Sequence, residues 1–202
     1  DGRIAVITGG AGLLGQKHGE AILECGGMPV LLDLDEEKAQ SIAESLSNKY
    51  DSKCLSLCVD ITQVEQIETS CVKLMDQFGR IDILINNAAN NPKIEAKRDI
   101  QLSRLEQFSI DEWNADIAVG LTGAFLCSRV FGSVMADAGK GAILNVSSDL
   151  GLIGPDQRLY EIKGLSANNQ PVKPVSYSVV KSGLIGLTRY LATYWADRGV
   201  RA

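Results

Sequence analysis

Short apolar runs alternate with amphipathic stretches along the whole chain, and this alternation restricts the possible folds more than any other feature. The apolar runs predict strands at 3–8, 29–33, 54–59, 81–86 and 141–147. Helical spacing of apolar residues predicts helices at about 13–25, 36–48, 62–78, 110–137 and 174–198. Strands that alternate with helices indicate a parallel sheet with helices on both faces, which is a doubly wound α/β fold.

The composition is that of one globular domain. The 202 residues are 45% hydrophobic and 22% charged, which is enough for one buried core over residues 1–202. The net charge of −5 gives no broad cationic field, so we expect neither nucleic acid nor a membrane as a partner. Five cysteines without a Cys-x-x-Cys pair, and a single histidine, argue against a metal site or a disulfide framework. Reduced thiols fit a cytoplasmic location.

Both ends of the sequence suggest that the domain is incomplete. The chain opens directly on the first predicted strand, and its last residues, 199–202, resemble the start of another strand. We see no signal peptide and no apolar run of about 18 residues. We therefore expect a domain that lacks its C-terminal strand and its substrate lid.

Two irregular stretches, 90–108 and 153–173, interrupt the alternation. Both follow the carboxyl end of a strand, where doubly wound sheets bind their ligands, so we interpret them as candidate substrate loops. Loops of this length are usually functional or disordered, although a long loop can also be a tolerated insertion. Arg158 and Lys163 in the second stretch could hold a phosphate or carboxylate, and could equally be solvated charges.

A glycine-rich turn, TGGAGLLG from Thr8 to Gly15, joins the first strand to the first helix. Glycines at this point let the backbone approach a pyrophosphate at the N-terminus of the helix. The residues that we expect to bind the cofactor here are Gly9, Gly12, Leu13, Leu14 and Gly15. The alternative is a purely structural tight turn.

Asp33 closes the second predicted strand. A carboxylate at this point accepts hydrogen bonds from the adenosine ribose and repels a 2′-phosphate, which predicts NAD rather than NADP as the cofactor. Asp35 is a weaker candidate for the same role. A structural role for Asp33, as a cap of the strand end, is the alternative.

Tyr177 and Lys181 stand four residues apart, and this spacing places both on one face of the last helix. An ammonium group near a phenol favours the phenolate, so such a pair can donate and accept protons. Many surface helices carry the same pair as a solvated contact, and the pair alone proves little.

Taken in order, the glycine turn, Asp33, Asp60, the NNAA run at 86–89, the NVSS run at 145–148 and the Tyr177/Lys181 pair resemble the short-chain dehydrogenase/reductase family. The resemblance implies a Rossmann-like fold and an NAD-dependent oxidoreductase. It also implies that Asp60, followed by Ile61, lies at the adenine.

The same resemblance implies roles for residues nearer the chemistry. Asn87 and Ala88 would line the centre of the cofactor site, and Ser148, rather than Ser147, would hydrogen-bond the reacting oxygen. Tyr177 would transfer the proton as general acid/base, and Lys181 would hold the nicotinamide ribose.

Three segments, at 86–92, 120–128 and 189–197, resemble a narrower group, the bacterial oxidoreductases of flagellin modification and nonulosonic-acid sugar biosynthesis. This implies an amino-sugar or sugar-phosphate substrate. Helices 110–137 and 174–198 commonly form a dimer interface in the family, so we expect a homodimer or homotetramer. The apolar residues that suggest a second contact face are Leu184, Leu187, Leu191 and Trp195.

Three departures from the family pattern qualify this resemblance. Leu13 replaces a common glycine and gives the turn the spacing of the nucleotide-sugar-modifying branch. Gly120 replaces an asparagine that anchors a water in the family, so we expect the gap to hold an extra water and Gly120→Asn to leave turnover similar or higher. The stretch 153–173 separates Ser148 from Tyr177 more widely than is usual.

The leading prediction is therefore an NAD-dependent oxidoreductase that interconverts a secondary alcohol and a ketone on a small, polar, sugar-like substrate. Two alternatives stay open. The glycine spacing favours a nucleotide-sugar epimerase or dehydratase that holds NAD tightly, and Gly120 favours a catalytically silent NAD-binding regulator.

Overall fold

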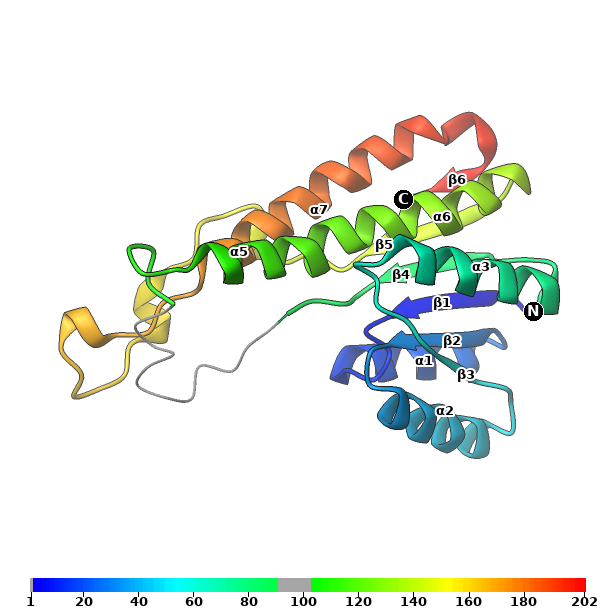
Figure 1. The fold of residues 1–202 in the computed structure, drawn as a ribbon, viewed down its shortest axis with the longest axis horizontal. Helices are drawn as coiled ribbons and strands as arrows, with labels where there is room; N and C mark the ends of the chain where they lie inside the picture. Colours follow the sequence, from blue (N-terminus) through cyan, green and yellow to red (C-terminus); the bar gives the residue numbers. More distant parts are fainter. Residues whose placement is uncertain (1, 91–102) are drawn as a thin grey trace.

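A computed structural model describes residues 2–90 and 103–202. It contains a parallel six-stranded sheet in the order β3-β2-β1-β4-β5-β6 (Figure 1). The strands are β1 (Ile4–Thr8), β2 (Met28–Asp33), β3 (Leu55–Cys58), β4 (Ile83–Asn86), β5 (Gly141–Asn145) and β6 (Val200–Arg201). The predicted doubly wound α/β fold is confirmed.

The helices follow the predicted ranges closely. They are α1 (Leu13–Glu24), α2 (Glu36–Tyr50), α3 (Val64–Phe78), α5 (Ile110–Ile117), α6 (Ala124–Asp137) and α7 (Val175–Tyr194). A π-helical segment, η1 (Ala118–Gly123), joins α5 to α6, so the predicted helix 110–137 is continuous but changes its hydrogen-bonding pattern in the middle. This long helix runs beside α7, and both extend beyond the sheet (Figure 1).

Apolar side chains of the strands alternate between two cores, as the two-residue period of a strand requires. Val6 on β1 faces the larger core, which contains residues of α3, α6 and α7. Ile7, the next residue, faces the smaller core with residues of α1 and α2. Both faces of the sheet are thus covered, which explains why the central strands are almost entirely apolar.

The strand order reverses direction between β1 and β4. The chain moves outward from β1 to β2 and β3 on one side, and from β4 to β5 and β6 on the other. At such a reversal the loops after the two central strands diverge and leave a crevice at the carboxyl edge of the sheet. The glycine turn follows β1 and Asn87 follows β4, so the fold brings both to this crevice.

The segment from 110 to 137 is long and apolar enough to cross a membrane, with a mean hydropathy of 1.6 over its most apolar window. The expectation of no such run was therefore too strong. Phe131 and Met135 on α6 are fully buried in the larger core. The helix therefore packs against the sheet through these residues.

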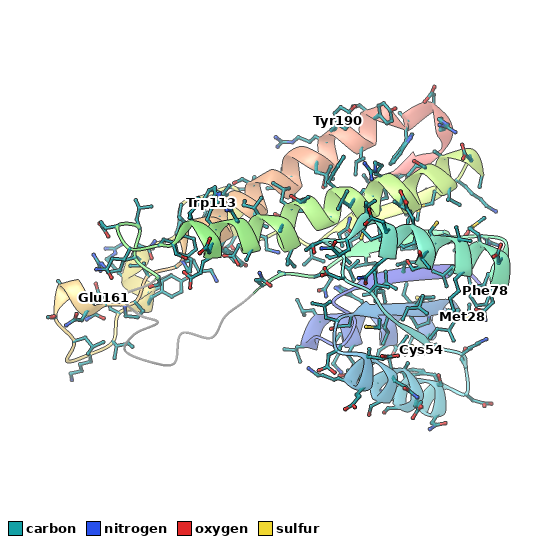
Figure 2. All side chains as sticks on the ribbon, viewed as in Figure 1. Met28, Cys54, Phe78, Trp113, Glu161 and Tyr190 are labelled. Atoms are coloured by element: carbon teal, nitrogen blue, oxygen red, sulfur yellow. The ribbon has the colours of Figure 1, made fainter. Side chains whose placement is uncertain are left out.

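The second irregular stretch, 153–173, contains two short 3-10 helices, η3 (Gln157–Tyr160) and η4 (Ala167–Asn169). It projects beyond the carboxyl edge of the sheet, and Glu161, which follows η3, lies well away from the strands (Figures 1 and 2). Arg104 anchors it by donating hydrogen bonds to the carbonyls of Ala167 and Gln170. Most of the first stretch, residues 91–102, lies outside the described residues.

Candidate active site

A cleft of about 650 Å³ opens at the carboxyl edge of the sheet, between the ends of β1 and β4. It brings together most of the residues that the sequence singled out. The predicted residues that line it are Gly9, Gly12, Leu13, Leu14, Asp33, Asp60, Ile61, Asn87, Ala88, Tyr177 and Lys181. Gly15 and Ser148 are not among the residues that line it.

The glycine turn is packed too tightly for side chains. Gly9 has a φ of +64°, and a Cβ there would lie 2.9 Å from the Cα of Ala88. A Cβ on Gly15 would lie 2.2 Å from the carbonyl oxygen of Gly9. The absence of both side chains lets α1 begin directly beneath the turn, as a pyrophosphate site requires.

The N-terminus of α1 faces the cleft. Gly12 is the N-cap and supplies no side-chain hydrogen bond to the helix. The first backbone N–H groups of a helix have no intrahelical acceptor and carry a partial positive charge. Leu13 and Leu14 at this terminus line the cleft and are largely exposed. The arrangement therefore fits a bound phosphate.

Asp33 joins the end of β2 to the glycine turn. Its Oδ2 accepts a hydrogen bond of 2.8 Å from the N–H of Ala11, and its Oδ1 accepts one of 3.1 Å from the N–H of Asp35. Each carboxylate oxygen can accept a second hydrogen bond, for example from a ribose hydroxyl. Asp35 instead caps α2 by accepting from the N–H of Lys38, so its side chain already has a structural role.

Asp60 and Ile61 form the wall of the cleft that follows β3. The Oδ1 of Asp60 accepts hydrogen bonds from both the N–H and the hydroxyl of Thr62. This fixes the turn before α3 and holds Asp60 at the cleft. Ile61 packs against Gly123, where a Cβ would come within 2.7 Å of its Cδ1.

Asn87 connects the end of β4 to the glycine turn. Its side-chain amide donates to the carbonyls of Thr8 and Gly9, at 3.0 and 3.1 Å. The hydroxyl of Thr8 in turn accepts from the N–H groups of Asn87 and Ala88, both at 3.1 Å. These bonds lock the end of β4 onto the glycine turn. The sequence analysis gave Thr8 no role of its own, although it opens the glycine motif.

Tyr177 and Lys181 lie one turn apart on α7, and both line the cleft. Lys181 is only 7% exposed, and its Nζ donates a hydrogen bond of 2.6 Å to the carbonyl of Val146, just beyond β5. Burial lowers the pKa of Lys181, and the positive charge of Lys173 lowers it further. The pair is therefore not the solvated surface contact that the spacing alone allowed.

Lys173 is a residue that the sequence analysis missed. It lines the cleft, and its Nζ lies 3.6 Å from the centroid of the Tyr177 ring, closer than the 5.7 Å of Lys181. Burial lowers its pKa. The only signal in the sequence was its position four residues before Tyr177, at the start of a helix.

Ser148 lies in a loop that is held tightly against α7. The hydroxyl of Ser147 donates to the carbonyl of Lys181 at 2.8 Å, and that of Ser182 donates to the carbonyl of Gly151 at 2.7 Å. Ser148 between them donates to Asp149 and caps the short 3-10 helix η2 (Asp149–Gly151). The hydroxyl of Ser147 is thus engaged by the backbone of α7, and the role of Ser148 stays a prediction.

Neither cation proposed for an anion clamp reaches the cleft. Arg158 pairs with Asp156 at 2.7 Å and is 82% exposed, and Lys163 is exposed. This interpretation of Arg158 and Lys163 was therefore wrong, because their part of the stretch projects away from the sheet, although Lys173 at its end lines the cleft. The solvated alternative is the correct one.

The space beside Gly120 is filled by Val180. A Cβ on Gly120 would lie only 2.6 Å from a methyl carbon of Val180, which is itself buried. The expectation of an extra water at this point was therefore wrong. The glycine instead permits close packing of η1 against α7, directly beside Lys181.

We expect Gly120→Asn to lower the free energy of unfolding by about 1–3 kcal/mol, the usual cost of overpacking a core. Val180 cannot rotate away cheaply because its β-branched side chain has few allowed rotamers. Urea unfolding of the single variants and of Gly120→Asn/Val180→Ala would measure the coupling. If the two substitutions were simply additive, the two residues would not be packing partners.

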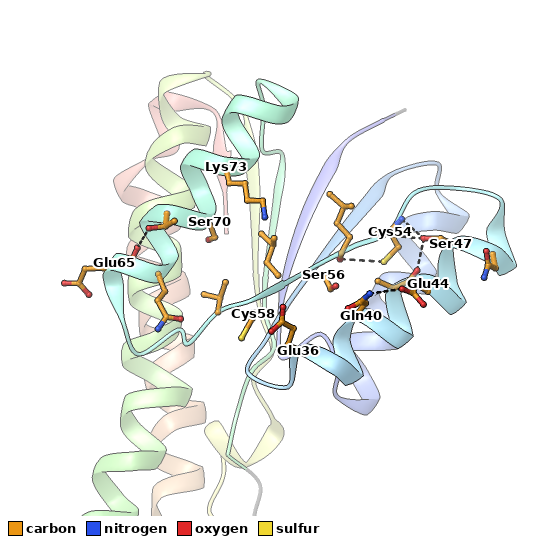
Figure 3. Close-up of a pocket in the computed structure, with 17 residues that line it drawn as sticks. Glu36, Gln40, Glu44, Ser47, Cys54, Ser56, Cys58, Glu65, Ser70 and Lys73 are labelled. Carbon is orange, nitrogen blue, oxygen red and sulfur yellow. Dashed lines mark hydrogen bonds between the residues drawn. The ribbon is translucent and has the colours of Figure 1, made fainter.

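A second groove, of about 1020 Å³, lies between α2 and α3 along the exposed edge of β3 (Figure 3). It is larger than the cleft, but its lining contains none of the predicted site residues. Glu36, Glu44 and Glu65 point to its rim rather than to a common centre (Figure 3). Within the described part of the chain, no three metal-ligating side chains are grouped together.

Comparison with known proteins identifies the family. The model of the short chain dehydrogenase family matches residues 3–160, which is most of the chain. The chain belongs to the short-chain dehydrogenase family. The narrower group, with its flagellin and nonulosonic-acid enzymes, is not represented among the names of the relatives reported below.

Individual members of the family resemble the chain over its whole length. D-threitol dehydrogenase of Mycolicibacterium smegmatis is 29% identical, with 100% of this chain and 67% of that protein covered. NAD-dependent glycerol dehydrogenase of Listeria innocua is 29% identical, with 98% and 66% covered. The crystal structure of a gluconate 5-dehydrogenase from Burkholderia cenocepacia with NADP and tartrate is 25% identical, with a TM-score of 0.82 and 100% and 69% covered. The chain thus spans about two thirds of the length of these relatives.

Proposed function

We propose that the chain is an NAD-dependent oxidoreductase that interconverts a secondary alcohol and a ketone on a small polyhydroxy substrate. One observation carries the proposal: Tyr177 and Lys181 line the same cleft as the glycine turn and Asp33. A proton donor and a dinucleotide cradle in one cleft are what hydride transfer to a carbonyl needs.

Each residue has a defined part in the proposed reaction. The backbone of the glycine turn and of α1 binds the pyrophosphate, and Asp33 binds the adenosine ribose. Tyr177 removes the hydroxyl proton during oxidation and returns it during reduction, while Lys181 holds the ribose of the nicotinamide and stabilises the phenolate. Ser148 stabilises the reacting oxygen as charge develops on it. The nicotinamide, when bound, supplies or accepts the hydride.

NAD is the proposed cofactor because Asp33 places a carboxylate at the end of β2, where it would repel a 2′-phosphate. Lys38 also lines this end of the cleft and could attract a 2′-phosphate. The carboxylates of Asp33 and Asp35 line the same end and oppose that attraction. Relatives do not decide the question, since one carries NAD in its name and another was crystallised with NADP.

The substrate class rests on the relatives, which are named for threitol, glycerol and gluconate. We propose a polyol or sugar acid for this chain, acting in the cytoplasm. The narrower proposal of an amino-sugar or sugar-phosphate substrate stays a prediction that enzymology must decide.

The deciding experiment is a substrate screen with the full-length protein. D-threitol, glycerol, D-glucitol and D-gluconate are offered with NAD⁺ or NADP⁺, and free reduced nicotinamide is followed by absorbance. Release of NADH supports the oxidoreductase. Conversion of a nucleotide sugar without free NADH would identify the epimerase or dehydratase instead, and cofactor binding without any turnover would identify the regulator.

We also propose that the chain forms a homodimer or homotetramer through α6 and α7. Leu184, Leu191 and Trp195 are buried inside the chain and Leu187 is partly buried against the core, so the choice of these four residues for the interface was wrong. The exposed apolar residues on these helices are Phe125, Val179, Tyr190 and Tyr194. Tyr190 and Tyr194 stack at 5.4 Å, and Figure 2 shows Tyr190 on the outer side of α7.

We expect light scattering of the full-length protein to give the mass of a dimer or tetramer, because these exposed aromatic residues gain from burial. Replacing both Tyr190 and Tyr194 by serine should shift the mass toward the monomer. A monomeric mass for the unmodified protein would contradict the proposal.

A further inference from the structure

Lys173 holds a second ammonium group at the reaction end of the cleft. We infer that it is a specificity-determining residue that binds an anionic group of the substrate, a carboxylate or a phosphate, near the carbon that reacts at Tyr177. The inference rests on the proposed function, and it narrows the substrate class from polyols in general to polyhydroxy acids or sugar phosphates.

Lys173 lies where it can contact a substrate at the reaction end of the cleft. Its Nζ lies 3.6 Å from the centroid of the Tyr177 ring and faces the cleft. An anion bound there would sit over the ring whose hydroxyl exchanges the proton. The reacting carbon and the anionic group would therefore be separated by only a few bonds.

The backbone at Lys173 is held in place by a hydrogen bond and by the proline that follows it. Its N–H donates a hydrogen bond of 2.8 Å to the side-chain oxygen of Gln157 in η3. Pro174 follows and is the N-cap of α7, and a residue before proline is restricted to extended conformations. The ammonium group is thus aimed from a rigid point, which reduces the entropy that binding would cost.

The charges around Lys173 also favour the binding of an anion. It is half-buried, so its ammonium group has lost part of its hydration. The cation–π contact with the Tyr177 ring offsets about 0.5–2 kcal/mol of the lost hydration free energy. Within residues 2–90 and 103–202, no carboxylate forms an ion pair with Lys173. A partly desolvated cation of this kind gains most from an anion that arrives with the ligand.

The nearby carboxylates are already engaged. Asp116 on α5 accepts a hydrogen bond from Ser176, and Asp149 accepts from Ser148 and from the N–H of Leu150. The acidic residues that line the cleft are Asp33, Asp35 and Asp60, which belong to the ends of β2 and β3.

Lys181 is the second cation at this end of the cleft, and its Nζ is bonded to the carbonyl of Val146. The two ammonium groups lie at the same ring, 3.6 and 5.7 Å from the centroid of Tyr177, so their like charges repel, and the pKa of Lys181, already lowered by burial, is lowered further. An anion beside Lys173 would relieve this repulsion. Lys181 is assigned to the cofactor in the proposed mechanism, which leaves Lys173 for the substrate.

The experiment compares three six-carbon substrates of the full-length protein: D-glucitol, D-gluconate and D-glucitol 6-phosphate. The variants are Lys173→Met, which keeps the apolar stem, and Lys173→Arg, which keeps the charge. Lys163→Met is the matched control, because Lys163 belongs to the same stretch, 153–173, but is exposed and does not line the cleft. Melting curves verify folding, and Lys173→Gln replaces Lys173→Met if the latter does not fold.

We expect the unmodified protein to prefer one of the two anionic substrates over D-glucitol. Lys173→Met should raise the KM for that anion about 10- to 150-fold, the value of a charged hydrogen bond. The test is the ratio between substrates: kcat/KM for that anion relative to kcat/KM for D-glucitol should fall about 10- to 150-fold in Lys173→Met, and Lys173→Arg should retain most of the preference. The preferred anion distinguishes a carboxylate from a phosphate.

Equal losses on all three substrates, or an unchanged preference in Lys173→Met, would overturn the inference while the proposed function stands. If no substrate yields NADH, the proposed function fails. The inference about Lys173 is then tested by measuring the binding of anions. Calorimetric titration of the NADH complex with D-gluconate and with inorganic phosphate should then show weaker binding in Lys173→Met. Equal affinities for the two proteins would overturn it.

Discussion

Replacement of Tyr177 by phenylalanine is expected to lower turnover by about 10²–10⁴-fold, the usual contribution of a general acid/base. The substitution removes only the hydroxyl oxygen, so the ring still packs beneath Lys173 at the wall of the cleft. Affinity for NADH, measured by fluorescence titration, should therefore change little. Loss of turnover with intact cofactor binding is the combination that the proposed mechanism requires.

Tyr190→Phe is the matched control for this experiment. Tyr190 lies on the same helix, is 61% exposed and stays outside the cleft. Its hydroxyl should contribute nothing to turnover. If Tyr177→Phe instead behaved like Tyr190→Phe, either another group would supply the proton or the chain would be a cofactor-binding regulator without catalysis.

Replacement of Gly15 by alanine is expected to weaken NADH binding severely and to destabilise the protein by about 1–3 kcal/mol. A single added carbon would lie 2.2 Å from the carbonyl oxygen of Gly9 and 2.8 Å from the Cα of Gly10. Both are backbone atoms, so the turn itself must move. Movement of the turn would displace the N–H groups proposed to bind the pyrophosphate. Urea unfolding and NADH titration measure the two effects separately.

Gly186→Ala provides the opposite case. Gly186 lies on an exposed part of α7, and apart from its two chain neighbours and the adjacent helix backbone no heavy atom lies within 4 Å of the position its Cβ would take. Alanine there should stabilise the protein by about 0.5–1 kcal/mol, because it reduces the entropy of the unfolded chain. Stabilisation at both positions would show that the tight packing at Gly15 is not a constraint in solution.

The sequence predicted the fold well because the fold depends on a pattern repeated over the whole chain. Each strand and helix was indicated by its own apolar period, and the strand boundaries were correct to within about two residues. The glycine turn and Asp33 could be placed at one edge of the sheet because parallel strands all end there. The local apolar patterns and the overall topology were consistent with each other, and together they predicted the position of the cleft.

The errors arose where the outcome depended on packing between distant segments. Gly120 was expected to leave a gap, but a side chain 60 residues away in the sequence, Val180, fills it. Arg158 and Lys163 were chosen by charge alone, and the direction of their loop was invisible in the sequence. Lys173 escaped notice because nothing in its own neighbourhood shows that it faces Tyr177.

The contact between Gly120 and Val180 has a consequence for how the two positions can vary among relatives. A relative with asparagine at position 120 needs a smaller side chain at position 180, and a relative without Val180 has room for a larger residue at 120. The two positions should therefore change together across relatives, and ancestral intermediates with a small residue at both should be the route between the two states.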